Sequence, residues 1–260
     1  MRHAGAVGHS ILQMMKAAVR PGVTTAELNE IARIELLRNN GIGTSKGYPT
    51  YKNNEGFPAE TCISVNEVVV HGIPGPRQLK EGDLVTLDLA LKVDNYCCDT
   101  AISVGVGEVS PRVQSLLDVT RQALDIALEV MKPGKKWSEV ARLIQHHVES
   151  NGFNVVREFV GHGVGRLMHE EPKVPNFVTA EQLRNDFRLR PGMTIAVEPM
   201  VVMGRRECVM LNDGWTIITE DRLPAAHFEH TVAVTETGVD VLSDGRVTVA
   251  PAATAISAAS

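Results

Sequence analysis

The sequence predicts an α+β protein in which helices and strands form two similar halves. Three observations support this fold class. Amphipathic helical patterns alternate with runs rich in Val and Ile that are typical of strands. Short sequence patterns recur in the same order about 110 residues apart. The 260 residues are 43% hydrophobic and 22% charged, as in a globular chain long enough to bury a substantial core.

Four helices are expected where apolar residues recur at helical spacing beside a start or stop signal. Thr24 or Thr25 is the expected cap of the second helix, because a side-chain oxygen can accept from free first-turn amides. Ser110 and Pro111 open the third helix, and Ser138 is the expected cap of the fourth. The expected ranges are 3–19, 24–39, 110–131 and 137–151.

Strands are expected where Val and Ile cluster between turn residues. The longest run is Leu84–Lys92, and the turn residues Asp94 and Asn95 follow it. We therefore expect a hairpin between this strand and the next one. The expected strands are 62–65, 84–92, 100–106, 194–202 and 230–235.

Three sequence patterns occur twice, in the same order. They pair residues 21–28 with 133–140, 79–88 with 189–198 and, more loosely, 98–104 with 228–234. One such pair can arise by chance, whereas three in order indicate two similar halves, about 1–109 and 110–246. We expect the halves to form one pseudo-symmetric domain over residues 1–246. Residues 247–260 carry no charge and no clear period, so we expect a flexible tail.

Charge and apolar runs exclude several kinds of partner. The net charge of −5 offers no basic surface to nucleic acid. No apolar run approaches the ~20 residues that a membrane-spanning helix needs. The four cysteines, with Cys97 next to Cys98, show no disulfide-like spacing. We expect a cytoplasmic protein that binds neither nucleic acid nor membrane, and whose first residues form a helix and not a signal or transit peptide.

Four carboxylates occupy matching positions in the two halves. Asp88 lies in an apolar strand and Asp99 opens the next, while Glu198 and Glu229 fall at the corresponding places of the second half. Converging carboxylates repel one another unless a cation neutralises them. His162, held between glycines, adds a nitrogen ligand. Such a set can hold two divalent ions about 3.5–4 Å apart and activate a water molecule. The ligand types suit Mn, Fe or Co, and Zn is compatible.

The glycines around His162 do not form a dinucleotide-binding motif. Residues 161–165 read Gly-x-Gly-x-Gly, and no helix with a later acidic partner follows them. His169 and Glu170 begin a segment without the second His of the zinc motif His-Glu-x-x-His. Neither a nucleotide site nor that zinc motif is expected.

In these residues the sequence resembles type I methionine aminopeptidases, a family of pita-bread metallopeptidases. The resemblance extends from Met1 to about Leu242. Its motifs, in the family's order and spacing, are Cys62–Glu67, Val70–Pro74, Asp88, Asp99-Thr100, Gly161–Gly165, His169–Pro172, Val197–Met200 and Glu229–Thr231. The resemblance implies a pseudo-twofold pita-bread fold, which is a curved antiparallel β-sheet backed by α-helices.

The resemblance also implies how the site is divided between the ions. Asp99 and Glu229 would bridge two divalent metal ions. Asp88 would complete the ligands of one ion, and His162 and Glu198 those of the other. Glu198 would also accept and pass on the proton of the attacking water.

Further residues would contact the substrate. By resemblance, His71 and His169 would bind it and stabilise the tetrahedral intermediate; the alternative is that they only hydrogen-bond to the ligands. Cys62, Phe57 and Trp215 match the family's pocket for the methionine side chain.

The chain departs from the family pattern at three places. Asn54 stands where a Tyr is usual, and Met168 stands where an aromatic residue is often found. The Met side chain is flexible and polarizable, so it can still line a pocket that binds the thioether of methionine. Cys97 and Cys98 replace the more usual His-Gly before Asp99. They are either packed in the core or a source of sensitivity to oxidation and soft metals.

The function implied is removal of the N-terminal methionine from nascent polypeptides whose second residue is small. The reaction would be attack of a metal-activated water on the methionine carbonyl. A proline-directed peptidase or creatinase-like enzyme is one alternative, although such relatives carry a large extra N-terminal domain. A metal-free binding module of the same fold is another, although it would have lost ligands. We expect a monomer that meets nascent N-termini at the ribosome.

Overall fold

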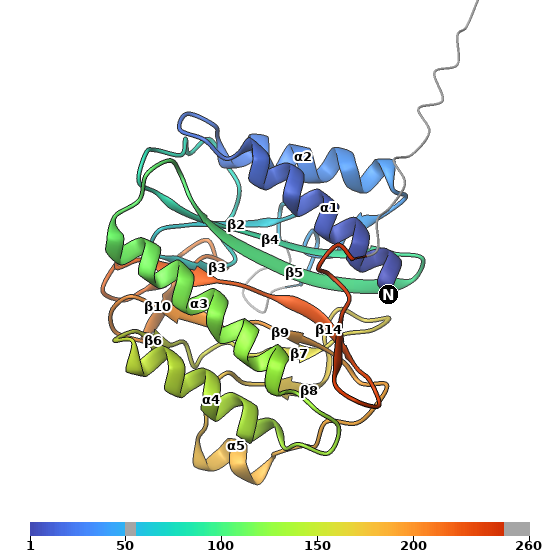
Figure 1. Cartoon of the computed structure of the whole chain (residues 1–260). Helices are drawn as coiled ribbons and strands as arrows, with labels where there is room; N and C mark the ends of the chain where they lie inside the picture. Colours follow the sequence, from blue (N-terminus) through green and yellow to red (C-terminus); the bar gives the residue numbers. More distant parts are fainter. Residues whose placement is uncertain (50–55, 247–260) are drawn as a thin grey trace, which may run out of the picture.

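The computed structural model describes residues 1–49 and 56–246, which build two halves stacked one on the other (Figure 1). Each half is a sheet covered by a pair of helices, the first pair above and the second pair below in this view. Asn54 and the predicted tail, 247–260, lie outside the described residues.

The four long helices begin and end within one residue of the predicted positions. They are α1 (Arg2–Ala18), α2 (Thr25–Arg38), α3 (Pro111–Val130) and α4 (Trp137–Ser150). Ser110 and Pro111 open α3 as predicted, and the Ser110 side chain caps the helix by accepting from the amide of Val113. A short helix, α5 (Ala180–Arg184), was not predicted. No helix in the described part of the chain is both long and apolar enough to span a bilayer.

The predicted caps of α2 and α4 have different outcomes. Thr24 caps α2, because its Oγ1 accepts from the amide of Glu27 while the Glu27 carboxylate accepts from the Thr24 amide. The prediction for Ser138 is wrong, since Lys136 is the N-cap of α4. Ser138 is already inside the helix, and its amide and hydroxyl donate to the Asp186 carboxylate at 3.0 and 2.6 Å.

The sheet of the first half contains the predicted hairpin. Its strands are β1 (Ile42–Gly43), β2 (Cys62–Val65), β4 (Leu84–Val93) and β5 (Tyr96–Gly105). Asp94 and Asn95 connect β4 to β5 with φ values of 50° and 64°. These left-handed values are those of a two-residue hairpin turn, so the hairpin is confirmed. β1 and β2 pair with the opposite edge of β4.

The main sheet of the second half has five strands in the order β15-β14-β9-β7-β8. They are β7 (Gly161–Gly163), β8 (Glu170–Val174), β9 (Thr194–Val197), β14 (His230–Val234) and β15 (Val239–Val241). The strand predicted over 194–202 is interrupted at Glu198 and Pro199, and Pro199 lacks the N–H that an uninterrupted strand would use.

Short strands complete two further sheets of three strands, β13-β10-β6 and β11-β12-β3, and of these strands only β10 falls within a predicted one, 194–202. They are β3 (Val68–Val70), β6 (Asn154–Val155), β10 (Met200–Val202), β11 (Cys208–Met210), β12 (Ile217–Thr219) and β13 (Ala225–His227). β10 continues directly from the break at Pro199, so the interruption moves the chain from one sheet to another.

The repeated sequence patterns form the same backbone hydrogen bonds in both halves. The amide of Gly22 donates to the Leu79 carbonyl, and the amide of Gly134 donates to the Leu189 carbonyl, both at 2.8 Å. Gly22 and Gly134 have φ values of 89° and 83°, which favour glycine. The repeated sequence patterns therefore form a repeated structure, in which the segment before a helix is hydrogen-bonded to the segment before a strand.

Each half packs its helices on its own sheet. In the first half Ile11 and Leu28, from α1 and α2, share a buried cluster with Leu87 of β4. In the second half Trp137 of α4 shares another cluster with Val197 of β9. The two clusters leave the inner faces of the sheets free to meet.

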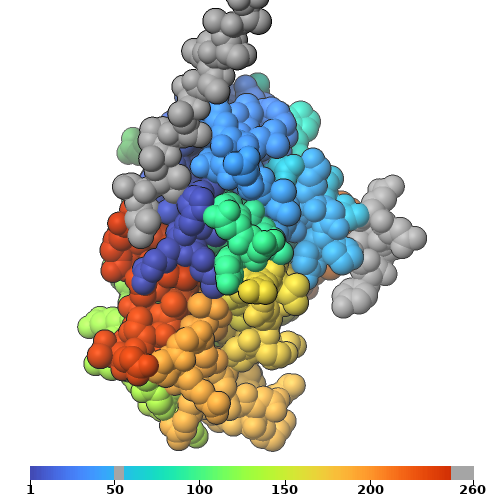
Figure 2. Space-filling view, turned by 90° about the vertical axis from the view of Figure 1, so that its right-hand side faces the viewer, coloured from blue at the N-terminus to red at the C-terminus, as the bar shows by residue number. Residues whose placement is uncertain are grey.

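The halves meet along β5 and β14. Ala101 and the residue that precedes β14, Glu229, form an isolated antiparallel bridge across this seam. At the tip of the β4–β5 hairpin the amide of Cys97 donates to the Gly165 carbonyl at 2.7 Å. In Figure 2 this green tip lies against the yellow segment that follows β7.

Candidate metal centre

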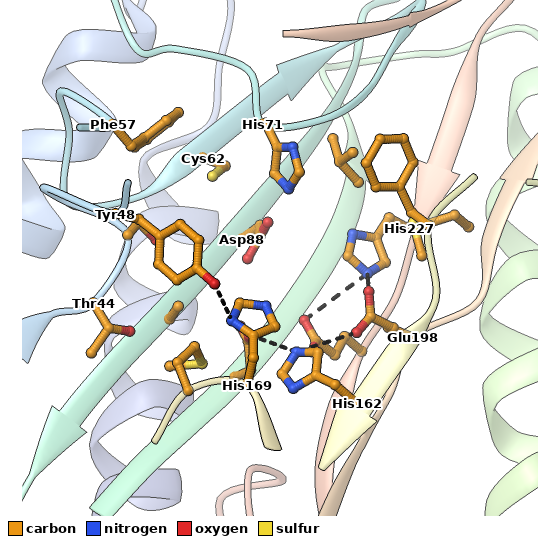
Figure 3. A pocket seen from close by; sticks show the side chains of 18 of the residues that line it. Thr44, Tyr48, Phe57, Cys62, His71, Asp88, His162, His169, Glu198 and His227 are labelled. Carbon is orange, nitrogen blue, oxygen red and sulfur yellow. Dashed lines mark hydrogen bonds and ion pairs between the residues drawn. The ribbon is translucent and has the colours of Figure 1, made fainter. Parts of the chain in front are cut away.

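All ten site residues predicted from the sequence line one cavity of about 220 Å³ at the seam (Figure 3). They are Phe57, Cys62, His71, Asp88, Asp99, His162, His169, Glu198, Trp215 and Glu229. The cavity therefore receives side chains from both halves.

The β4–β5 hairpin places the two aspartates on one face of the sheet. Asp88 is opposite Ala101, and Asp99 is opposite Ala90, in an unbroken antiparallel register. Because side chains alternate along a strand, Asp88 and Ala90 face the same way, as do Asp99 and Ala101. Asp88 and Asp99 are thus diagonal neighbours that point into the cavity.

Glu198 and Glu229 lie where strands of the second half are interrupted. Glu198 separates β9 from β10, and its free carbonyl accepts from Nδ2 of the buried Asn176 at 2.9 Å. Glu229 separates β13 from β14, and its amide donates to the Ala101 carbonyl at 2.9 Å. Each break leaves the carboxylate pointing inward.

Thr231 fixes the backbone of Asp99 across the seam. Its Oγ1 accepts from the Asp99 amide at 2.9 Å and donates to the Asp99 carbonyl at 2.8 Å. Thr100 makes a corresponding bond in the other direction, from its Oγ1 to the Glu229 carbonyl at 3.1 Å. The two acids expected to be shared between ions are therefore locked to each other through hydroxyl groups.

His162 has the hydrogen bonding of a metal ligand. Its Nδ1 donates to the Gly163 carbonyl at 2.9 Å, which leaves the lone pair of Nε2 free. Nε2 lies 3.5 Å from Asp99 Oδ2 and 3.6 Å from Glu198 Oε1. A Cβ at Gly163 would collide with the Glu171 carbonyl oxygen, so glycine is needed for β8 to approach so closely.

The electrostatics of the site favour the binding of a cation. Burial and the nearby Asp99 raise the pKa of Asp88 well above its usual value, and burial followed by Asp99 and Glu198 does the same for Glu229. Burial also raises the pKa of Glu198 to about 7. These shifts reflect charged groups that lack a compensating partner.

The donor atoms fit a divalent cation. Asp99, His162 and Glu229 each offer one ligand atom, and these atoms lie within 4.8 Å of one another. Within the described residues, the buried Asp99 Oδ1 and Glu229 Oε1 have no hydrogen-bond partner. Asp88 and Glu198 line the same space. A set of four carboxylates and one imidazole can hold divalent transition-metal ions.

Two of the histidines predicted from the sequence lie outside this donor set. His71 has a left-handed φ of 59°, and its ring packs edge-on against Phe159 and Trp215 with centroids 5.5 and 6.5 Å apart. Burial lowers the pKa of His71 to about 4. His169 lies next to His162, with ring centroids 4.2 Å apart. Both imidazoles can therefore offer a hydrogen bond to a substrate in the cavity.

One end of the cavity is apolar. Phe57 and Trp215 meet edge to face with centroids 5.3 Å apart, and Cys62 packs with them. Met168, which replaces a more usual aromatic residue, also lines the cavity. A flexible apolar side chain fits between such groups.

Cys97 and Cys98 are packed within the fold. The Cys97 thiol contacts the Arg166 carbonyl at 3.5 Å, and Cys98 Sγ would lie 3.6 Å from a Cβ at Gly8 of α1. Both are free cysteines. Of the two interpretations drawn from the sequence, the structure favours a packing role.

Tyr48 and His227 are polar residues of the cavity that were not among the predicted site residues. Tyr48 lies near its opening, and its hydroxyl is 3.0 Å from His169 Nδ1 (Figure 3). His227 is buried beside Glu198 and Glu229, and burial lowers its pKa to about 4. The position of His227, two residues before Glu229, was the available signal. Tyr48 has no such signal, because the resemblance places Asn54, and not Tyr48, at the position of the usual Tyr.

The fold and the donor set define a metallopeptidase: the chain belongs to metallopeptidase family M24, which matches residues 1–236. It is 42% identical over 243 residues to methionine aminopeptidase 1 of Bacillus subtilis (strain 168), with 94% of each chain covered. It is 39% identical over 245 residues to the methionine aminopeptidase of Escherichia coli (strain K12), covering 94% of this chain and 89% of that relative.

Solved structures confirm the predicted pita-bread fold. The crystal structure of methionine aminopeptidase from Thermotoga maritima has a TM-score of 0.88 at 39% identity, with 94% of each chain covered. The Xaa-Pro dipeptidase from Bacillus anthracis has a TM-score of 0.71 at 21% identity and is covered over 59% of its length. This second likeness concerns the fold alone.

Proposed function

We propose that this chain is a metalloaminopeptidase that removes the N-terminal methionine from polypeptides whose second residue is small. One observation carries the proposal: a donor set of four carboxylates and one imidazole lies in the same cavity as a small apolar pocket. Such a site can bind the first side chain of a peptide and hydrolyse the bond that follows it. The curated relatives named above support the choice of methionine.

Five side chains would hold two divalent ions. Asp99 and Glu229 would be shared between the ions, Asp88 would serve one of them, and His162 and Glu198 would serve the other. When bound, the ions supply Lewis acidity and lower the pKa of a water molecule. Co, Mn, Fe and Zn are each compatible with these ligands.

The other residues of the cavity would bind substrate and move protons. Glu198 would accept the proton of the attacking water and return it to the leaving amine. His71 and His169 would hydrogen-bond to the scissile group and stabilise the oxyanion. The apolar end, with Phe57, Cys62 and Trp215, would hold the methionine side chain.

Residues 1–246 would form one catalytic domain of two halves, about 1–109 and 110–246. The ligands support this division, because neither half provides all five. The substrates would be nascent N-termini, met in the cytoplasm at the ribosome, and the active species would be a monomer.

A peptide assay tests the proposed function. The protein is loaded with Mn, Co, Fe or Zn and incubated with Met-Ala-Ser and Ala-Pro peptides. We expect methionine release from the first peptide and no cleavage of the second. Cleavage of the Ala-Pro peptide alone would indicate a proline-directed enzyme, and no cleavage with any metal would refute the proposal.

A further inference from the structure

His227 is a buried imidazole in the cavity that neither the metal ligands nor the substrate contacts account for. Its side chain is 3% exposed, and neither ring nitrogen has a hydrogen-bond partner within the described residues. An unpaired polar group at this depth costs free energy. The ring therefore needs a polar partner in the functional protein.

The backbone of His227 is held firmly at the end of β13. Its amide donates to Ser103 Oγ at 2.8 Å, and Ser103 Oγ donates to the His227 carbonyl at 2.9 Å. Ser103 belongs to β5, the strand that carries Asp99. The imidazole is thus fixed relative to both halves of the site.

The ring points its Nε2 between two carboxylates (Figure 3). Nε2 is 4.0 Å from Glu198 Oε2 and 4.0 Å from Glu229 Oε2. Either a metal ion or a proton on Nε2 can make this arrangement favourable, because both oxygens are negatively charged when ionised.

The hydrogen bonding of His162 differs from that of His227, and the difference indicates whether Nε2 of His227 carries a proton or binds a metal ion. His162 donates its Nδ1–H to a carbonyl, as metal-bound imidazoles almost always do, and this leaves Nε2 free for an ion. Nδ1 of His227 has no such acceptor among the described residues. A neutral imidazole carries one proton, and the acceptors in front of His227 face Nε2. When both carboxylates are ionised, as metal binding requires, the proton belongs on Nε2, and a protonated nitrogen cannot bind a cation.

We infer that His227 is a positioning residue whose Nε2–H holds the Glu198 carboxylate, together with that of Glu229, in the orientation needed for proton transfer. The inference rests on the proposed function of this site. A separation of 4.0 Å is about 1 Å longer than a hydrogen bond. Contacts of this kind at catalytic sites commonly shorten when substrate binds.

The kinetic test compares two substitutions at this position. His227→Leu removes the donor, and we expect kcat for a Met-Ala-Ser peptide to fall about 10- to 100-fold, as for loss of a hydrogen bond to a charged group, with KM within threefold. His227→Gln restores an N–H, so its kcat should stay within about fivefold of wild type. His146→Leu, on an exposed position of α4, is the control and should leave kcat unchanged.

Wild-type kcat in His227→Leu, or equal losses of kcat in the Leu and Gln variants, would overturn the assignment of His227 as a positioning residue. If His227→Leu does not fold, His227→Asn replaces it, because its amide is too short to reach Glu198 and should behave like Leu. Absence of methionine release by the wild-type protein would instead refute the proposed function.

A metal-binding measurement separates a donor from a ligand without using activity. In the Co²⁺-loaded protein, each coordinated histidine gives one exchangeable N–H proton signal strongly shifted by the paramagnetic ion. We expect one such signal, from His162, in the wild type and in His227→Gln. Two signals in the wild type, with one lost in His227→Gln, would show that His227 is a ligand and overturn the inference.

Discussion

The two halves of the molecule supply the proposed metal ligands in different ways. In the first half, Asp88 and Asp99 lie in an uninterrupted hairpin, and the regular alternation of side chains is enough to place them together. In the second half, Glu198 and Glu229 lie at breaks between strands, and His162 sits in a short strand between glycines. The repeated framework thus tolerates a regular sheet on one side and an irregular one on the other. The irregular side also provides His162, the one imidazole of the proposed donor set.

The strongest test of this comparison is Asp99→Asn, because Asp99 is the first-half ligand that also contacts the second half. We expect kcat/KM for methionine release to fall by at least about 10³-fold, together with loss of both ions, since an amide cannot neutralise two cations. Asp94→Asn, at the exposed hairpin turn, is the control. Full activity in Asp99→Asn would show that the hairpin does not supply a shared ligand.

The second prediction concerns the irregular half. Gly163→Ala should destabilise the fold by about 3 kcal/mol or more and displace His162, because the added Cβ collides with the Glu171 carbonyl. Gly75→Ala is a matched control in the first half, where a Cβ would meet no atom within 4 Å. Thermal unfolding and metal content measure the two effects. Equal stability of the two variants would mean that β8 is free to move away.

His169→Ala tests whether the second half supplies substrate contacts apart from its ligands. We expect kcat to fall about 100-fold, as for loss of one oxyanion donor, while the number of bound ions is unchanged. Kinetics with a Met-Ala-Ser peptide and metal analysis of the same sample measure both. Loss of metal would show that His169 belongs to the donor set.

The smallest effect is expected for Tyr48→Phe, which removes a hydroxyl from the first half that contacts His169 of the second. Loss of one hydrogen bond should lower kcat about fivefold to tenfold. The loss should vanish when His169 is already Ala, because the hydroxyl would act through that ring. Tyr96→Phe, at the hairpin tip, controls for removing a hydroxyl. An equal loss in the His169→Ala background would show that Tyr48 acts by itself.

The regular parts of the site could be predicted from the sequence because their signals are local. The apolar run around Asp88 and the turn residues Asp94 and Asn95 predicted the hairpin and both aspartates. Repetition of the same pattern then indicated Glu198. Helix ends were predictable for the same reason, as Thr24 and Glu27 form a capping box within four residues.

The remaining features depend on contacts between distant segments. Ser138 was predicted as a cap, but Asp186, which binds it, lies 48 residues away. His227 belongs to a strand of three residues, too short to show a period, and its environment is created by Glu198 and Ser103. Tyr48 reaches His169 across 121 residues. No local pattern encodes such distances.

In the proposed enzyme, ligands from both halves form one centre for two ions. The most direct test of this arrangement is metal analysis of the protein equilibrated with excess Co²⁺, for the wild type and for Asp99→Asn. We expect two ions per chain in the wild type and none in the variant. Two ions retained by Asp99→Asn, or at most one bound by the wild type at saturation, would contradict it.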